Sequence, residues 1–86
     1  MKVNFHSRFN KSYKKCSIKI QAQFKKRLKL FLDNPYHPLL ENHALHGEWR
    51  DFRSINVTGN YRALYHYLNN DTVEFFVIDT HSNLYE

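Results

Sequence analysis

Histidine supplies the clearest candidates for chemistry in this 86-residue chain, which contains six: His6, His37, His43, His46, His66 and His81. The imidazole ring gives and takes a proton near neutral pH, so each ring is a candidate general acid or base. His43 and His46 have the i, i+3 spacing of a metal site, but this pair alone is a weak signal. We expect solvated loop residues or a role on a substrate, and we predict no metal and no cofactor.

His81 differs from the other histidines because it directly follows a strongly apolar strand pattern near the end of the chain. A strand end on a rigid sheet holds a side chain at a fixed place on the surface, as an acid or base requires. His66 lies between Tyr65 and Tyr67 and is instead predicted to be a packed structural residue. The chain has only two glycines, which excludes a glycine-rich phosphate loop.

The elements that must position these residues begin with a strand and two helices. Alternation over residues 2–5 predicts a short first strand. Ser7 is the predicted cap of a helix on which apolar residues recur at i, i+4 and i+7. A second helix is predicted from about Ile18 to Leu32, and it ends before Pro35 because the residue preceding proline avoids the α region. Together they form a hairpin with one apolar and one cationic side.

The pattern then changes to the period of a strand, and two tight turns separate three runs: Trp49 to Val57, Tyr61 to Leu68 and Val73 to Thr80. In the last run Val73, Phe75 and Val77 are expected on one face, with Phe76 and Ile78 on the other. The order β-α-α-β-β-β predicts class α+β, with the helical hairpin packed on a mostly antiparallel four-stranded sheet. The length allows one domain, residues 1–86.

Charge is divided unevenly along the chain. Residues 1–32 hold ten Lys and Arg and no acid, whereas residues 33–86 hold three Lys and Arg and eight acids, so the two parts carry +10 and −5. Ten cations without one anion repel each other, and a polyanionic partner explains them better than solubility alone. Composition therefore favours RNA, DNA or an acidic protein as partner.

Several classes of protein are excluded. The longest mostly apolar stretch, Leu28 to Leu32, is far shorter than the roughly 20 residues of a membrane span. The beginning of the chain has no apolar segment typical of a secretory signal. Cys16 is the only cysteine, so it forms no disulfide within the chain and no thiolate cluster. We expect a cytoplasmic protein.

Two segments carry a resemblance to a known family. Leu45-His46-Gly47-Glu48-Trp49-Arg50-Asp51-Phe52-Arg53-Ser54-Ile55, followed by Asn60-Tyr61-Arg62-Ala63-Leu64-Tyr65, resembles the RelE/ParE superfamily of type II toxins. The ending Thr80-His81-Ser82-Asn83-Leu84-Tyr85 is similar to the Thr-His-Ser-x-Leu-Phe close of its YafQ branch, and Asn42-His43-Ala44-Leu45 to that branch's Asp-His-Pro-Leu. The motifs match residues 42–85, whereas the N-terminal part matches only in being helical and basic.

This resemblance implies a ribosome-dependent endoribonuclease, or mRNA interferase, that cuts messenger RNA by attack of its 2′-hydroxyl group. His43 and His81 match two catalytic histidines of YafQ-type toxins, and Tyr85 matches a functional aromatic residue. Arg62 matches an arginine that RelE and YoeB toxins use against the scissile phosphate, although YafQ lacks it. For Arg62 the alternative is an ion pair with Asp51 or Glu74, and for Tyr85 it is packing on the sheet. The implied partners are a cognate antitoxin, ribosomal RNA and messenger RNA, with operator DNA bound through the antitoxin.

Departures from the family pattern leave other functions open. Asn56 stands where YafQ has a third histidine and Asn60 where it has an aspartate, and neither amide moves a proton. The residues expected to contact RNA are Lys25, Lys26, Lys29, Arg53, Asn56, Asn60 and Tyr61. One alternative is a ParE-like toxin that binds DNA gyrase without cleaving RNA. Another is an inactive relative that binds only its antitoxin.

Overall fold

The computed structural model describes residues 1–85. Its element order is β1 (Lys2–Phe5), α1 (Ser7–Lys15), α2 (Ile18–Asp33), η1 (Pro38–Leu40), β2 (His43–Ala44), η2 (Gly47–Trp49), β3 (Arg53–Asn56), β4 (Tyr61–Asn69), β5 (Thr72–Thr80) and α3 (His81–Leu84). One sheet has the order β1-β5-β4-β3-β2, with β1 parallel to β5 and the other pairs antiparallel. The predicted α+β class is confirmed, while the expected four strands become five because β2 adds an edge strand.

The two long helices begin and end as their sequences dictate. The Ser17 hydroxyl accepts a hydrogen bond from the Ile20 backbone N–H at 3.2 Å and starts α2, which ends beside Asn34 and Pro35. The cap of α1 was expected at Ser7 but is His6, whose Nδ1 accepts from the Arg8 backbone N–H at 3.0 Å. No helix within residues 1–85 is long and apolar enough to span a membrane.

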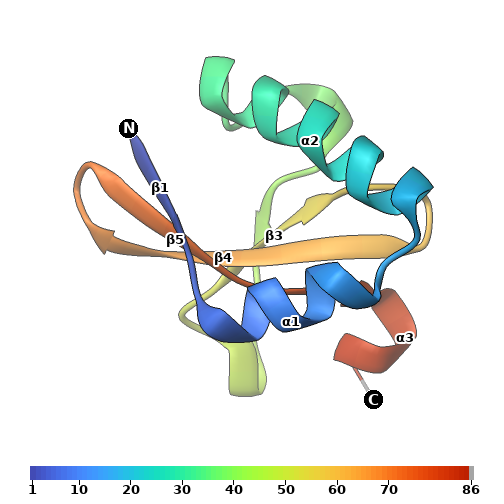
Figure 1. Cartoon of the computed structure of the whole chain (residues 1–86). Helices are drawn as coiled ribbons and strands as arrows, with labels where there is room; N and C mark the ends of the chain where they lie inside the picture. The colour runs from blue at the N-terminus through green and yellow to red at the C-terminus, as the bar shows by residue number, and fades with distance from the viewer. Residues whose placement is uncertain (86) are drawn as a thin grey trace.

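The main core lies between the helices and one face of the sheet. Phe75 of β5 is fully buried, and its ring centroid lies 5.4 Å from that of Phe24, 5.5 Å from that of Phe31 and 5.9 Å from that of Phe9. Both helices therefore cover the same face, called the helix face below. Figure 1 shows α1 alongside β5, and α3 at the end of the sheet opposite to the N-terminus.

The other face of the sheet carries a second, smaller cluster, called the rear cluster below: Leu45, Leu64, Val77 and Leu84, with Trp49, Phe52 and Phe76 packed against them. The predicted strand from Trp49 to Val57 was too long, since β3 covers only Arg53–Asn56. The segment before it turns at Gly47, whose φ is +66°, and folds Trp49 and Phe52 under the sheet. A left-handed φ of this kind costs glycine nothing.

A bulge in β5 overturns the predicted assignment of its faces. Tyr65 pairs with Phe75, but Leu64 pairs with Val77, so Phe76 is an extra residue on β5. Beyond the bulge Ile78 packs on the helix face with Phe75, whereas Val77 packs in the rear cluster with Phe76. The expected alternation placed Val77 and Ile78 the other way round because it assumed an uninterrupted strand.

Candidate functional site

Strand pairing brings several predicted site residues to one end of the sheet. Arg62 at the start of β4 pairs with Asn56 at the end of β3 on one side and with Asp79 near the end of β5 on the other. Asn60 precedes β4, and His81 follows β5. We call the set Asn56, Asn60, Arg62 and His81 the site edge. Three separate segments of the chain supply it, so it exists only in the folded protein.

His81 is held at the site edge by its backbone and is exposed at its side chain. Its N–H donates to the Asn60 carbonyl oxygen at 2.8 Å, which ties α3 to the turn before β4. The ring of Tyr85, one turn further along, meets the His81 ring edge to face with 4.6 Å between centroids. The structure therefore brings two of the predicted catalytic residues together in one exposed pair.

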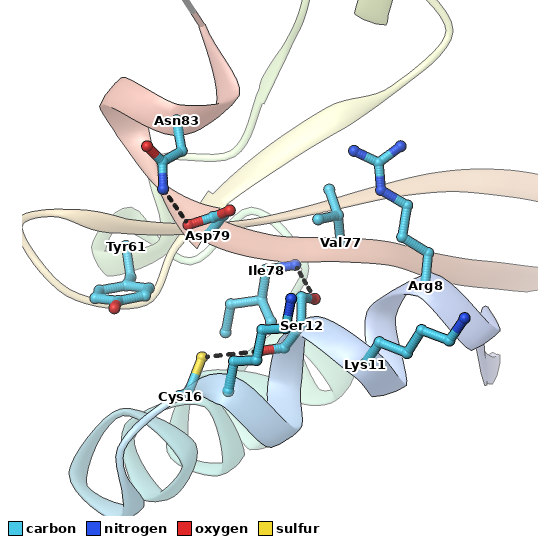
Figure 2. Close-up of a pocket in the computed structure, with 10 residues that line it drawn as sticks. Arg8, Lys11, Ser12, Cys16, Tyr61, Val77, Ile78, Asp79 and Asn83 are labelled. Atoms are coloured by element: carbon cyan, nitrogen blue, oxygen red, sulfur yellow. Dashed lines mark hydrogen bonds between the residues drawn. The ribbon is translucent and has the colours of Figure 1, made fainter.

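Besides the His81 backbone bond, four further anchors hold the single turn of α3. The Thr80 hydroxyl accepts from the Asn83 N–H at 3.3 Å, and the Asn83 side-chain amide donates to an Asp79 carboxylate oxygen at 3.0 Å (Figure 2). The Leu84 side chain is buried in the rear cluster. Its carbonyl oxygen accepts from the Trp49 indole N–H at 3.2 Å. A helix this short needs such anchors, because an isolated turn does not persist in water.

Arg62 is fixed by the turn between β3 and β4. Its Nη1 donates to the carbonyl oxygens of Thr58 at 3.0 Å, Gly59 at 3.3 Å and Tyr61 at 3.1 Å. The alternative of an ion pair with Asp51 or Glu74 finds no support within residues 1–85, where Glu74 instead pairs with His66 at 2.8 Å. Carbonyl oxygens orient a guanidinium but do not neutralise it, and within residues 1–85 Arg62 forms no ion pair, although Asp79 is its cross-strand partner.

His43 lies on β2, where it pairs with Ser54 of β3. Its Nδ1 is 2.8 Å from the Glu41 carbonyl oxygen, which can only accept, so Nδ1 carries the hydrogen. The neutral ring then presents Nε2 as a free proton acceptor. Pairing places His43 on the same sheet face as Asn56 and Arg62.

The same pairing separates the two candidate catalytic histidines. His43 on β2 lies three strands from β5, about 14 Å across the sheet at the usual strand spacing. Within residues 1–85 no hydrogen bond or ring contact joins His43 to His81. An RNA strand that contacts both must cross β3 and β4.

The other residues expected to contact RNA occupy different surfaces. Asn60 and Tyr61 adjoin His81, and Lys26 on α2 lines a hollow of about 260 Å³ next to Thr58, close to the site edge. Lys29 is exposed on the same helix, and Lys25 lines a separate hollow of about 230 Å³ between α1 and α2.

Arg53 lies apart from the site edge, on the helix face. Its row across the sheet contains Tyr65 and Phe75. Its Nε donates to the Asn42 side-chain oxygen at 2.8 Å, and its guanidinium carbon lies 5.5 Å from the Tyr36 ring centroid. Asn42 also donates to the Tyr65 hydroxyl at 2.8 Å. This network gives Arg53 a structural role, and we leave it out of the RNA contacts proposed below.

Comparison with known families identifies the chain. The family described as ParE toxin of type II toxin-antitoxin system, parDE, matches residues 3–85. The chain belongs to this ParE toxin family. The resemblance to the RelE/ParE superfamily is thereby confirmed. Comparison with the curated proteins gives no match.

Solved structures agree with this toxin's fold. YafQ from E. coli strain BL21(DE3) matches with a TM-score of 0.81 and 19% identity over 98% of this chain and 97% of YafQ. The chain matched in the E. coli DinJ-YafQ toxin-antitoxin complex has a TM-score of 0.78 and 19% identity, over 98% of this chain and 96% of the matched chain. A YoeB/ParE toxin from Agrobacterium tumefaciens matches with a TM-score of 0.76 and 15% identity, over 94% of this chain and 99% of that toxin. Identities this low show the shared fold.

Sequence reasoning missed three residues of the toxin that position α3: Trp49, Asp79 and Asn83. Trp49 was assigned to a strand, although the glycine two residues before it signalled a turn. A threonine at the end of an apolar run is a common helix cap, and Thr80 was the available signal for α3.

The remaining histidines have structural or solvent-exposed places. His37 caps η1 by accepting from the Leu39 N–H at 3.1 Å, and His66 stacks on Phe52 with 4.7 Å between ring centroids, as its predicted packing role requires. His46 precedes η2, is exposed and makes no side-chain capping bond. Within residues 1–85 no group of three or more His, Cys, Asp or Glu side chains is arranged to hold a metal ion.

Proposed function

We propose that this toxin is a ribosome-dependent endoribonuclease that cleaves messenger RNA and thereby inhibits translation. The observation that carries the proposal is the exposed His81–Tyr85 pair beside Arg62, a cation that forms no ion pair within residues 1–85. The family motifs single out His43 and these three residues. Their arrangement offers a proton-transfer group, a ring for a base and a cation for a phosphate at one end of the sheet.

The proposed reaction transfers two protons, so it needs a base and an acid. A base takes the proton of the 2′-hydroxyl, and the 2′-oxygen attacks the adjacent phosphorus. The bond from phosphorus to the 5′-oxygen breaks, and an acid protonates that oxygen. His81 is one of these two groups, and proton transfer of this kind contributes roughly 10²- to 10⁴-fold each. Arg62 donates its remaining N–H groups to the phosphate oxygens, and Tyr85 stacks on the splayed nucleotide.

His43 is proposed as the second proton-transfer group. The hydrogen bond to the Glu41 carbonyl leaves its Nε2 unprotonated in the neutral ring, which is the form that a general base requires. Base and acid act on the same phosphate, so the scissile phosphate has to lie over β3 and β4, between His43 and His81. We propose that Asn56, Asn60 and Tyr61 contact the RNA there, and that Lys25, Lys26 and Lys29 of α2 contact RNA on the helix side.

The proposed partners follow from charge and from the solved relatives. One of the solved relatives is the E. coli DinJ-YafQ toxin-antitoxin complex. We propose that this toxin likewise binds a cognate antitoxin. The +10 charge of residues 1–32 favours ribosomal RNA and an acidic antitoxin segment. We propose that operator DNA is bound through the antitoxin, and that the toxin acts in the cytoplasm, where ribosomes and messenger RNA are found.

The test is primer extension on a reporter message translated in vitro, with and without ribosomes. We compare the wild type with His81→Gln and with His46→Gln, a control that removes an exposed histidine outside the site edge. Cuts that need ribosomes and His81 but not His46 support the proposal. Equal cutting by the His81→Gln variant would show that the acid–base assignment is wrong. Absence of cuts together with DNA damage in induced cells would favour the gyrase-directed alternative.

A further inference from the structure

A groove of about 490 Å³ lies between α1 and the outer edge of β5 and ends at α3. It exists because β1 pairs with β5 only from Thr72 to Phe75, so the rest of β5 has no neighbouring strand on that side. There α1 takes the place of a strand, and the Ser12 hydroxyl accepts from the Ile78 backbone N–H at 3.1 Å (Figure 2).

Three cations line one side of this groove. Arg8, Lys11 and Lys15 stand at i, i+3 and i+7 on α1, which places them on one helical face over about 10 Å of helix. Among residues 1–85 the ion pairs involve none of these three side chains. The one carboxylate lining the groove, Asp79, accepts at Oδ1 from the Thr80 backbone at 2.7 Å and from Asn83 at 3.0 Å. The groove therefore carries three positive charges against one carboxylate, which is hydrogen-bonded at the α3 end.

Arg8 is held in a fixed position without an acidic partner. Its guanidinium carbon lies 5.1 Å from the Phe76 ring centroid and 5.6 Å from that of Trp49. Aromatic faces hold a guanidinium by its plane, which leaves its N–H edge available to an anion. Binding there costs less side-chain entropy than binding to a mobile cation.

We propose that this groove, named the α1 groove, binds the phosphodiester backbone of single-stranded RNA. The inference rests on the proposed function, because it identifies where the RNA continues beyond the site edge. The groove is continuous with the site edge, because its lining residues Tyr61, Asp79 and Asn83 belong to the elements that carry Arg62 and His81. This continuity favours RNA over an acidic protein segment as the occupant. The half-buried Tyr61 also offers a ring near the backbone track. RNA carries one negative phosphate at every nucleotide, so its backbone matches the successive cations along α1.

The test measures fluorescence anisotropy of a labelled RNA oligonucleotide whose 2′-O-methyl groups prevent cleavage, over a range of salt concentrations. The groove variant is Lys11→Gln with Lys15→Gln. The control is Lys2→Gln with Lys14→Gln, which removes the same charge from exposed positions outside the groove. Each lost phosphate contact lowers the slope of log K against log salt by about 0.7 for single strands, so the groove variant should lose about 1.4. If the wild type and the groove variant bind equally at 1 M salt, a slope difference of 1.4 makes the groove variant bind roughly 25-fold more weakly at 0.1 M salt.

Several outcomes would overturn the inference. Equal losses of slope in both double variants would show that overall charge, and not the groove, causes the effect. An unchanged slope in the groove variant, together with weaker binding to the antitoxin, would assign the groove to an acidic protein. Pelleting with ribosomes, with and without message, separates the sources of RNA: a loss without message identifies ribosomal RNA, and a loss only with message identifies the substrate strand. Groove-dependent binding without cleavage of any message would refute the proposed function and leave the groove standing.

Discussion

Replacing Trp49 by phenylalanine tests whether the rear cluster positions α3, the helix that carries the proposed catalytic residue His81. The Trp49 indole N–H donates to the Leu84 carbonyl oxygen across 35 residues of sequence. The ring also packs edge to face on Phe52, with 5.3 Å between centroids, and on Phe76, with 6.1 Å. Phenylalanine keeps an aromatic ring in this place and removes the donor. The substitution thus removes the bond that anchors α3, together with the larger ring that contacts Arg8.

The size of the effect follows from the loss of one hydrogen bond. A neutral hydrogen bond contributes about 0.5 to 1.5 kcal/mol net, which corresponds to a change of roughly 2- to 13-fold in the ratio of docked to undocked helix. The other anchors of α3 remain, among them the bond from the His81 N–H to the Asn60 carbonyl oxygen at 2.8 Å. We therefore expect kcat to fall by at most this factor, with KM nearly unchanged. Tm should fall by about 4 to 8 °C for each kcal/mol lost from the unfolding free energy.

The assay combines kinetics in the ribosome-dependent cleavage reaction with NMR order parameters of residues 81–85. The matched control is Phe52→Leu, which weakens the same cluster through its contacts with Trp49, His66 and Phe76 but leaves the bond to Leu84 in place. Trp49→Phe should lower both kcat and the order parameters, whereas Phe52→Leu should lower mainly Tm. If both variants lose kcat in proportion to Tm, and the order parameters stay equal, the positioning argument is refuted.

Three further predictions concern single side chains. His43→Gln should lower kcat as His81→Gln does, and an effect confined to KM would assign His43 to RNA binding alone. Tyr85→Phe should retain most activity, while Tyr85→Ala should lose about 1 to 3 kcal/mol of base stacking, measured as weaker binding of the oligonucleotide. Burial raises the pKa of Tyr65 above its ordinary value of 10.0, against a smaller opposite effect of the bond from Asn42. The neutral phenol is therefore favoured by folding, so stability is complete below pH 10 and falls as pH rises through the folded pKa. Tyr65→Phe should flatten this alkaline loss in urea titrations, and an unchanged pH dependence would show that another group causes it.

The parts of the fold that could be predicted are those with a clear period. The polar and apolar faces of α2 and the caps at Ser17 and Asn34 determine that helix almost to the residue. The bulge at Phe76 could not be predicted, because residues 75–78 are all apolar and a shift of register leaves no mark in such a run. The two-residue strand β2 has too few positions to show any period.

The candidate site was predictable in its residues but not in its geometry. His81 and Tyr85 are close in sequence, and their contact could be inferred from one helical turn. The placement of Arg62 beside Asn56, and the distance from β2 to β5, depend on strand order, which no local pattern reveals. Arg53 was expected on the RNA side because its motif resembles the family. The register of β3 places it on the helix face instead.

The two faces of the sheet differ in how much side-chain packing they can lose before function is affected. The helix face buries eleven residues in one cluster, so opening it requires unfolding the domain. The rear cluster buries four, and one of them, Leu84, belongs to α3 itself. Undocking α3 therefore exposes little apolar surface and needs much less free energy than global unfolding. Substitutions in the rear cluster should impair catalysis before they unfold the protein, and amide exchange at Leu84 should be faster than at Phe75.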